Sequence, residues 1–425
     1  MQIYQVGGAV RDKLLGIKAH DTDYVVVGAT EGEMKALGFK PVGKYFPVFL
    51  HPVTKEEYAL ARLETKTGDK HTDFEFVFSP DITLRQDLER RDLTCNAIAY
   101  DEESQTYIDY FGGIQDIKER LLRHINAAHF VEDPLRVLRV CRLSAQLDFE
   151  IFPETLQLCK KMVSSGALEH LSIERILEEL VKALKTRHPS KFFAAMHDIG
   201  ALTHIMPELE ALYTVPEPAE KQTSFERTMQ SLDQCQSQSL LVKYAVLTHH
   251  FGKALTPQNC LPYHNGHENR AGTPIAALSH RLNVPKQYLF FAKAAAKYHT
   301  LFPRIFKLRA RTLYCLIKNL TKSHTSYINE YIELCRADFE SIPHQNLQKS
   351  RRAFEERASR LKFAFDTLQS AKASDMPGFE HLPKDAKFAK IFEAYQISIL
   401  TDALQHAPKQ PTKKGLSVAG RPTPL

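Results

Sequence analysis

Two stretches near the start of the chain decide the fold: Val6-Gly7-Gly8-Ala9-Val10-Arg11-Asp12 and Asp21-Thr22-Asp23-Tyr24-Val25-Val26-Val27. The first predicts a glycine turn that leads into a helix, and the second predicts a strand that opens with two carboxylates. Because side chains alternate along a strand, both aspartates point to one face. Like charges held so close favour a divalent metal between them, and the N–H groups of the glycine turn favour a phosphate. Together the stretches predict a site for a metal-bound nucleoside triphosphate.

Either stretch alone is a weak signal, and the alternative is an exposed loop beside an unrelated Asp-x-Asp. Gly7-Gly8 is not followed by the Gly-Lys-Ser/Thr of a P-loop, nor does it fit the dinucleotide pattern GxGxxG. The two stretches stand close together and flank strand-like runs, which favours the catalytic interpretation.

Composition sets broad limits. The 425 residues suffice for about two to four domains, and the net charge of +6 permits a nucleic-acid partner without requiring one. The seven cysteines are odd in number and form no CxxC pair, which indicates reduced thiols in the cytoplasm. The N-terminus lacks the pattern of a signal peptide, and no apolar run is as long as a membrane span. We therefore expect a cytoplasmic protein without membrane association.

Residues 1–123 mix strand and helix patterns. The predicted strands are Gln2–Val6, Tyr24–Val27, Val48–His51, Tyr58–Ala61 and Phe74–Phe78. The predicted helices are Ala9–Leu15, Glu31–Leu37, Ile82–Arg90 and Leu93–Tyr100. The polar stretch Leu63–Thr72 predicts a mobile loop beside the site.

From Leu135 onward strand patterns nearly vanish. Amphipathic patterns predict helices over Leu135–Leu147, Glu154–Val163, Ser172–Lys185, Ser190–Ile199 and Ser350–Gln369. Polar breaks near Tyr213–Gln222 and Ser341–Gln348 predict boundaries. The stretch His406–Leu425 holds four prolines and no apolar periodicity, which predicts a disordered basic tail.

Two further groups of residues have both a functional and a structural interpretation. In Arg90-Arg91-Asp92-Leu93-Thr94-Cys95-Asn96 the arginines can clamp a triphosphate while Asp92 or Asn96 reaches a ribose hydroxyl. The alternative is a helix-terminal basic pair with Asp92 as N-cap. In Glu132-Asp133-Pro134-Leu135-Arg136 the local pattern favours structure, with Asp133 as N-cap and as the i,i+3 partner of Arg136.

Six stretches in order carry a family resemblance: VGGAVRDKLLG, DTDYVVVG, ERRDLTCNA, YFGGIQDIKERLLRHI, EDPLRVLRVCRL and LSIERILEEL. They closely resemble the bacterial class II CCA-adding enzymes, which are tRNA nucleotidyltransferases, and VGKYFPVFLHPVTKEEYALAR is especially similar to the proteobacterial form. The resemblance is dense over residues 1–210, thinner to about residue 300 and weak beyond. It implies an α+β fold, in which a polymerase-β-like head with a small mixed sheet precedes an all-α neck, body and tail.

The resemblance implies five parts along the chain. They are a nucleotidyltransferase head (1–123), a helical neck that binds the nucleotide base and RNA (124–215), a helical body (216–340), a helical tail (341–405) and the basic tail (406–425). The implied activity is template-independent addition of C, C and A to the 3′ end of tRNA from CTP and ATP. We expect tRNA as the partner and a monomer or weak homodimer.

The resemblance also assigns roles to single residues. Asp21 and Asp23 are implied as the catalytic residues that hold Mg²⁺, and Glu57 is a candidate third carboxylate. The residues implied to bind the nucleotide are Gly8, Arg11, Arg91, Asp133, Arg136 and Arg139. Asp133 and Arg136 are implied to serve as a protein template for the base, since a carboxylate accepts from the amino group of C or A while a guanidinium donates to the adjacent ring nitrogen. Uracil and guanine present the reverse order and leave both groups unpaired.

The body departs from the family pattern. Many proteobacterial relatives carry a metal-dependent phosphohydrolase domain with an adjacent His-Asp pair, and here His249 is followed by His250 instead. In the family a ligand histidine stands upstream of this pair, and we expect Glu226 at that position here. Downstream of the pair, Asn265 stands at a third position of the family pattern. His249, His250, His264 and His267 can still gather around Ni, Zn or Cu. Loss of the bridging aspartate disfavours hydrolysis and favours a remnant scaffold that helps to hold tRNA.

Competing functions remain open. One is a partial enzyme that adds only CC or only A, or a poly(A) polymerase; the retained Leu63–Thr72 favours the complete activity, because the resemblance implies that CC-adding relatives lack this segment. Another is a metal-dependent phosphohydrolase acting on tRNA ends or nucleotides. A third is a non-catalytic tRNA-binding protein, which the two intact aspartates disfavour.

Overall fold

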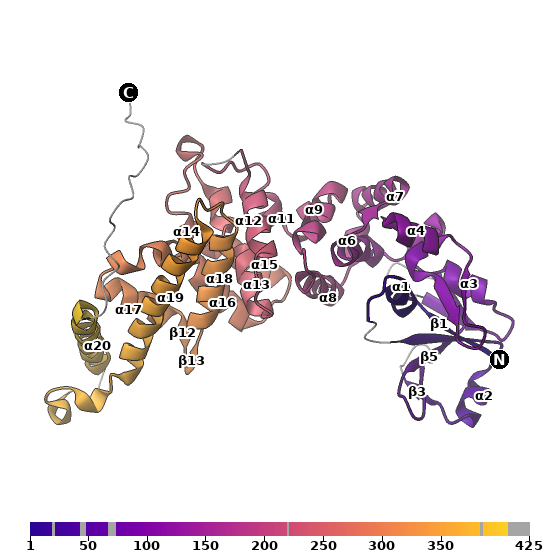
Figure 1. Cartoon of the computed structure of the whole chain (residues 1–425), viewed down its shortest axis with the longest axis horizontal. Coiled ribbons are helices and arrows are strands. Elements are labelled where there is room, and N and C mark those ends of the chain that lie inside the picture. Colours follow the sequence, from indigo (N-terminus) through magenta and orange to yellow (C-terminus); the bar gives the residue numbers. More distant parts are fainter. Residues whose placement is uncertain (19–21, 43–47, 67–73, 219–220, 383–385, 407–425) are drawn as a thin grey trace. The chain divides into compact units, whose positions relative to one another are not determined.

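The computed structural model describes residues 1–18, 22–42, 48–66, 74–218, 221–382 and 386–406 (Figure 1). It divides into a first unit, Met1–Ala211 with His280–Asn283, and a second unit, Leu212–Ser279 with Val284–Leu425. The division near residue 211 lies close to the break that the sequence predicts at Tyr213–Gln222. The finer division into five parts stays a prediction, and the predicted disorder of the tail falls on residues 407–425, outside those described.

The first unit begins with a mixed seven-stranded sheet in the order β3-β4-β5-β2-β1-β8-β9. Its strands are β1 (Gln2–Val6), β2 (Asp23–Val27), β3 (Lys40–Val42), β4 (Val48–Leu50), β5 (Glu57–Leu60), β8 (Ile98–Asp101) and β9 (Thr106–Asp109). β2 runs antiparallel to β1 and parallel to β5. This arrangement confirms the expected small mixed sheet.

Apolar clusters cover both faces of the sheet. Val25 packs with Leu84 and Leu88 of α3 (Leu84–Glu89) on one face. Its neighbours Tyr24 and Val26 pack with Met34 of α2 (Glu31–Ala36) on the other. Burial on both faces explains why β2 reads as an unbroken apolar run rather than an alternating one.

The predicted helix Leu93–Tyr100 is wrong. The structure has a short 3₁₀ turn at Thr94–Asn96, followed by strand β8, which pairs with both β1 and β9. Ala97, Ile98 and Ala99 are fully buried. A short apolar run that is buried on both faces shows no periodicity that separates a strand from a helix, so the pattern was ambiguous. The strands β3 and β9 were also not predicted.

The predicted loop Leu63–Thr72 is partly wrong. Its first residues belong to β6 (Arg62–Lys66), which pairs antiparallel with β7 (Phe74–Phe78) as a separate two-stranded ladder. The strand expected at Phe74–Phe78 is confirmed. The remainder of the predicted loop, residues 67–72, lies outside the described residues.

The first unit also contains several helices. α1 (Gly8–Leu14) lies between β1 and β2. The helices that follow the last strand of the sheet are α4 (Gly113–Glu119), α5 (Ala127–Glu132), α6 (Leu135–Leu147), α7 (Pro153–Ser164), α8 (Ile173–Leu184), α9 (Ser190–Ile199), α10 (Ala201–Ile205) and α11 (Pro207–Glu210). Two short strands, β10 (Leu121–Leu122) and β11 (Glu150–Ile151), pair with each other among these helices. The bounds of α6 and α9 agree with the predicted ones. α6 packs against α8 and α9 and so forms the centre of this helical part (Figure 1).

The second unit is almost entirely helical. Its longer helices are α12 (Ser224–Asp233), α13 (Leu240–Thr248), α15 (Gly272–Arg281), α16 (Lys286–Tyr298), α17 (Ala310–Asn319), α18 (Ile328–Glu340), α19 (Leu347–Ser370) and α20 (Ala386–His406). Shorter elements are α14 (His267–Arg270), the 3₁₀ helices η3 (Phe251–Leu255) and η5 (His299–Lys307), and the pair β12 (Thr321–Lys322) and β13 (Thr325–Ser326). α13 packs against α12, α16 and α18 and forms the core of this unit (Figure 1).

No helix in the described ranges combines the length and the apolar character that crossing a membrane requires.

Candidate functional site

Strand register brings the two opening stretches together. Val6, the last residue of β1, lies opposite Asp23, the first residue of β2, so the Gly7-Gly8 turn begins beside the Asp23 carboxylate. Asp23 is also paired in register with Glu57 on the parallel strand β5. Asp21 lies outside the described residues, so its place beside Asp23 stays a prediction.

Gly7 fits where no other residue does. Its φ of 77° lies in a region that L-residues rarely adopt, and a Cβ there would lie 3.1 Å from Arg91 Nη1 and 3.9 Å from Asp23 Oδ2. The turn, the carboxylate and the guanidinium therefore converge on one point. This convergence explains why a glycine must stand at the entry to α1.

Replacing Gly7 by alanine is expected to lower the free energy of unfolding by about 1–3 kcal/mol, through backbone strain, and to raise the KM for nucleotides, because Arg91 must move. Gly16→Ala is the matched control, since Gly16 also has a positive φ of 70° but a Cβ there would meet nothing within 4 Å. Urea unfolding and nucleotide kinetics of both variants provide the test. Equal KM values in the two variants would contradict the proposed contact.

A buried hydrogen-bond network joins α1 to α6. Arg11 binds Asp12 Oδ1 at 2.7 Å and donates from Nη1 to Asn96 Oδ1, also at 2.7 Å. Asn96 Nδ2 donates to Asp92 Oδ1 at 3.0 Å, and Arg139 Nε donates to Asp92 Oδ2 at 2.8 Å. The sequence suggested Asp92 or Asn96 as a ligand of a ribose hydroxyl. In the structure these two side chains bind Arg11 and Arg139 and hold the two guanidinium groups in place.

Asp92 is ionised and tightly held. Burial works to raise the pKa of Asp92, but the Arg139 guanidinium and the Asn96 amide outweigh it and hold the pKa well below the ordinary value. The same contact raises the pKa of Arg139. Because the native pKa of Asp92 is depressed, its stabilisation is present above the unfolded-state pKa near 3.8 and is lost as the pH falls toward the native value.

Asp92→Asn is expected to destabilise the first unit by about 2 kcal/mol at pH 7, since it leaves Arg139 facing an amide donor. The difference from the wild type should shrink as the pH falls below about 4, where the wild type begins to lose the same interaction. Thermal midpoints measured from pH 7 down to pH 3 test this. Asp198→Asn, an exposed carboxylate on α9, is the control, and a pH-independent difference would refute the assignment.

Arg91 carries an orphaned polar atom. Its Nη2 donates to the fully buried Asp87 at 3.4 Å, but no described atom accepts from its buried Nε. Burial lowers the pKa of Arg91, which Asp87 partly offsets. A buried N–H without an acceptor costs free energy until a ligand supplies one, so Arg91 is poised for an anion.

Asp133 and Arg136 do not form the i,i+3 pair that the local pattern suggested. Asp133 accepts two hydrogen bonds from Arg175, at 2.7 and 3.1 Å, and a third from Leu135 N at 3.1 Å. The N-cap of α6 is Pro134, so the predicted N-cap at Asp133 is wrong by one residue. Arg136 instead donates to the carbonyl oxygens of Arg90 and His129. Arg175 was missed as a site residue, although its stretch LSIERILEEL was among the quoted motifs.

These residues line one cavity of about 750 Å³ in the first unit. It contains Gly8, Arg11, Asp23, Arg91, Asp133, Arg136 and Arg139, which are all the described residues that were predicted to hold the catalytic metal or the nucleotide, whereas Glu57, the candidate third carboxylate, is not among the residues that line it. Eight arginines face three aspartates in its lining. This excess of guanidinium groups suits a polyanion such as a triphosphate.

The donor set fits a divalent metal of the hard type. Polymerase-type nucleotidyl transfer depends on divalent metal ions in general. Here the carboxylate of Asp23 stands at the cavity edge beside the Gly7 turn, with Glu57 adjacent on the next strand. Oxygen ligands of this kind suit Mg²⁺ better than a soft metal.

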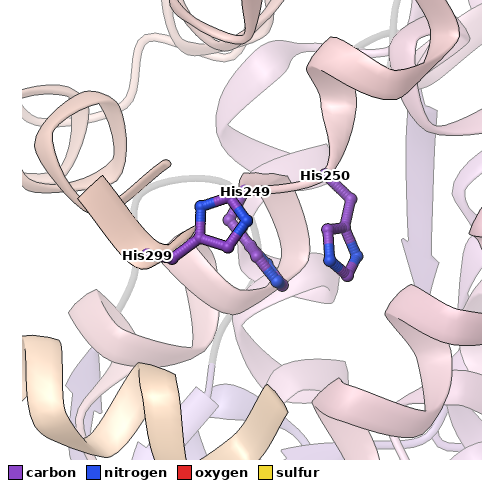
Figure 2. Close-up of side chains that lie close together, drawn as sticks. All are labelled: His249, His250 and His299. Atoms are coloured by element: carbon purple, nitrogen blue, oxygen red, sulfur yellow. The ribbon is translucent and has the colours of Figure 1, made fainter. Parts of the chain in front are cut away.

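The second unit holds a separate group of histidines. His249, His250 and His299 are buried and lie close together, with ligand nitrogens within 4.8 Å of one another (Figure 2). His267 joins them, with its Nε2 at 3.2 Å from His299 Nε2. His250, His267 and His299 border a cavity of about 430 Å³ that also contains Arg227, Lys253 and Asp338.

Two predictions for this region need correction, and one residue was missed. Glu226 is not in the cavity; it is the exposed capping-box partner of Thr223, and Arg227 faces the cavity instead. His264 is also directed elsewhere, because its Nδ1 contacts Thr256 Oγ1 and its Nε2 contacts the Pro216 carbonyl. His299, which was missed, takes the place expected for His264; it had no recognisable motif around it.

Burial lowers the pKa of His250 and His299 well below the ordinary value and that of His267 to about 4. The charge of Lys253 lowers the pKa of His250 and His267 further, whereas the carboxylate of Asp338 partly offsets the lowering at His299.

Sequence comparison gives two domain families. Residues 3–123 match the Poly A polymerase head domain, and residues 148–213 match the probable RNA and SrmB-binding site of polymerase A. These ranges coincide with the sheet-containing part and with the helices that follow it.

Whole-chain comparison finds close relatives. The chain is 42% identical over 415 residues to a multifunctional CCA protein of Acinetobacter baumannii, covering 95% of this chain and 97% of that protein. It is 48% identical over 333 residues to a multifunctional CCA protein of Mannheimia succiniciproducens, covering 75% and 79%. Among solved structures, the Bacillus stearothermophilus CCA-adding enzyme in complex with CTP shares the fold, with a TM-score of 0.64 and 22% identity over 94% of this chain and 89% of that one.

Proposed function

Because the chain belongs to the family of multifunctional CCA proteins, class II CCA-adding tRNA nucleotidyltransferases, we propose that it adds C, C and A to the 3′ end of tRNA. CTP and ATP are the donors, and pyrophosphate leaves. The observation that carries the proposal is the convergence of the Gly7 turn, the Asp23 carboxylate and the Arg91 guanidinium in one arginine-rich cavity.

Each side chain has a task in this reaction. Asp23, together with Asp21, holds Mg²⁺, which when bound lowers the pKa of the tRNA 3′-hydroxyl and neutralises charge on the triphosphate. Arg11, Arg91 and Arg139 bind the triphosphate, and the Gly7-Gly8 turn lets its oxygens approach the backbone. The bonds from Asn96 and Asp92 keep Arg11 and Arg139 oriented before the nucleotide enters.

Asp133 and Arg136 read the base. Asp133 accepts from the amino group of C or A, and Arg136 donates to the neighbouring ring nitrogen. Arg175 orients Asp133 through two hydrogen bonds. Together with the Leu135 N–H they occupy both lone pairs of Oδ1 and one of Oδ2, which leaves one lone pair of Oδ2 for the base. UTP and GTP place a carbonyl against Asp133 and an N–H against Arg136, so both protein groups lose their partners.

The test is transfer from each labelled nucleotide to tRNA that lacks its 3′ CCA, with Mg²⁺ present. We expect C and A to be incorporated with release of pyrophosphate, and U and G to be excluded. Equal transfer of U, or no transfer of C or A, would refute the proposal. Phosphate release from a 2′,3′-cyclic nucleotide without nucleotide transfer would favour the phosphohydrolase instead.

A further inference from the structure

Lysines gather around one groove of the second unit. It has a volume of about 600 Å³, and residues of α14, α15, α16, α17 and β12 line it (Figure 1). Among the described residues of its lining are Lys286, Lys293, Lys297 and Lys322 but a single acidic residue, Glu268. The described linings of this groove and of the cavity beside the histidines have no residue in common. The groove is therefore a separate cationic surface, and the proposed reaction has not yet given it a role.

The sequence of α16 places three of these lysines on one side of the helix. Lys286, Lys293 and Lys297 follow one another at intervals of seven and four residues, which bring side chains to the same face. Leu289 and Phe290 stand between them and also line the groove. Since a helix rises by about 1.5 Å per residue, the three lysines extend over about 16 Å along its axis. Charges that follow a line suit an extended polyanion better than a single small anion.

The lysine side chains are held in place without being neutralised. A Cβ on Gly272, the first residue of α15, would lie 3.4 Å from Lys293 Cε, so the aliphatic stem of Lys293 packs against the glycine. Lys322 Nζ lies 5.2 Å from the ring centroid of Phe290. In the part of the chain that the structure describes, no carboxylate forms an ion pair with any of the four lysines. An aromatic face attracts a cation but leaves its net charge, so the ammonium groups keep their capacity to bind phosphate.

The alternative is that these lysines only keep one face of a helix soluble. A solvated helix face usually carries acidic and basic residues four positions apart, which pair with one another. α16 contains three lysines and neither aspartate nor glutamate. Its positive charges therefore repel one another in the free protein, and a bound anion relieves this repulsion. The composition of α16 favours a binding surface over a merely solvated one.

We infer that the lysine groove binds the sugar-phosphate backbone of tRNA, an inference that takes the identity of the RNA from the proposed function. Folded RNA is recognised mainly through its phosphates and its shape, and lysines supply point charges that do not read bases. The cavity of the first unit differs, since its eight arginines can pair bidentately with a triphosphate or a base. The lysine groove thus adds affinity for tRNA of any sequence, whereas the first unit selects the nucleotide.

The test is binding of labelled tRNA that lacks its 3′ CCA to the full chain, measured by fluorescence anisotropy at several salt concentrations. The triple variant Lys293→Gln/Lys297→Gln/Lys322→Gln should bind roughly 10- to 100-fold more weakly at about 0.1 M salt. The slope of log Kd against log salt should fall by about 2, because each lost phosphate contact removes about 0.7–0.9. The KM for tRNA should rise by a similar factor, while the KM for CTP and the kcat at saturating tRNA stay unchanged.

Two further triple variants are the controls. Lys293→Arg/Lys297→Arg/Lys322→Arg keeps the charges and should bind tRNA within about threefold of the wild type. Lys349→Gln/Lys362→Gln/Lys372→Gln removes three exposed lysines from α19 and the segment that follows it in the same unit. This variant has the same net charge as the glutamine variant of the groove, and it should keep the salt slope of the wild type.

Equal losses in the two glutamine variants would overturn the inference, because the effect would then follow from net charge alone. Unchanged tRNA binding by the groove variant would overturn it as well, and loss of binding to vesicles of anionic phospholipid in that variant would then assign the groove to a membrane surface. Binding is measured without nucleotides, so its dependence on the groove is observed even if neither C nor A is transferred. Failure of this inference and failure of the proposed function are therefore distinguishable.

Discussion

Nucleotide transfer is expected to fall by roughly 1,000-fold or more, or about 4 kcal/mol in the activation barrier, when Asp23 is replaced by alanine. The reason is local. Asp23 opens β2 at the edge of the arginine-rich cavity, beside the Gly7 turn and in register with Glu57. Removal of its carboxylate leaves Mg²⁺ with fewer hard ligands and removes one of the two carboxylates, Asp23 and Asp87, whose charges raise the pKa of Arg91.

The fold should survive this change, because the Asp23 side chain is exposed and packs in neither apolar cluster of the sheet. Steady-state transfer to tRNA and far-UV circular dichroism measure both properties. Glu31→Gln is the matched control, as Glu31 is an exposed carboxylate of the same unit on α2 that pairs only locally, with Lys35 at 3.2 Å. Retention of more than about a tenth of wild-type transfer in Asp23→Ala would contradict the assigned role.

Replacement of Arg136 by methionine should abolish most of the selection of C and A over U and G. The loss of its donor leaves the ring nitrogen of C or A unpaired and removes the donor–donor conflict with U or G. The ratio of kcat/KM for CTP to that for UTP is expected to fall by roughly 100-fold or more. Competition between labelled CTP and UTP on tRNA measures the ratio directly.

The ratio is insensitive to how much of the variant is folded, which matters because Arg136 also bonds the Arg90 and His129 carbonyls. Arg187→Met serves as the control, since it removes one exposed positive charge from the same unit. It can lower the rate with every nucleotide but should leave the ratio unchanged. An unchanged ratio in Arg136→Met would assign base selection to other residues.

Local sequence patterns correctly predicted those elements in which a single buried face gives the apolar residues a regular spacing. α9 has one apolar face, so its bounds were readable. α6 is buried over more of its surface, and the proline that precedes it, Pro134, marked its start. β8 was misread as a helix because its residues are buried on both faces, and β6 because a polar hairpin strand resembles a loop.

The head site was predictable because its residues stand in short motifs, whereas the contacts between motifs were not. Nothing in the order of residues indicates that Asp133 pairs with Arg175, 42 positions away, or that Asn96 holds Arg11, 85 positions away. The histidine site shows the same limit: His299 comes from a separate helix, and only packing brings it to His249 and His250 (Figure 2).

Stepwise extension of a tRNA that lacks its CCA end, resolved to single nucleotides on a sequencing gel, tests the central claim most directly. CTP alone should extend the tRNA by two residues and stop, and ATP added afterward should extend it by one and stop. A product that stops after CC, an addition only to tRNA that already ends in CC, or a run of many A residues would each contradict complete CCA addition and identify a partial enzyme or a poly(A) polymerase.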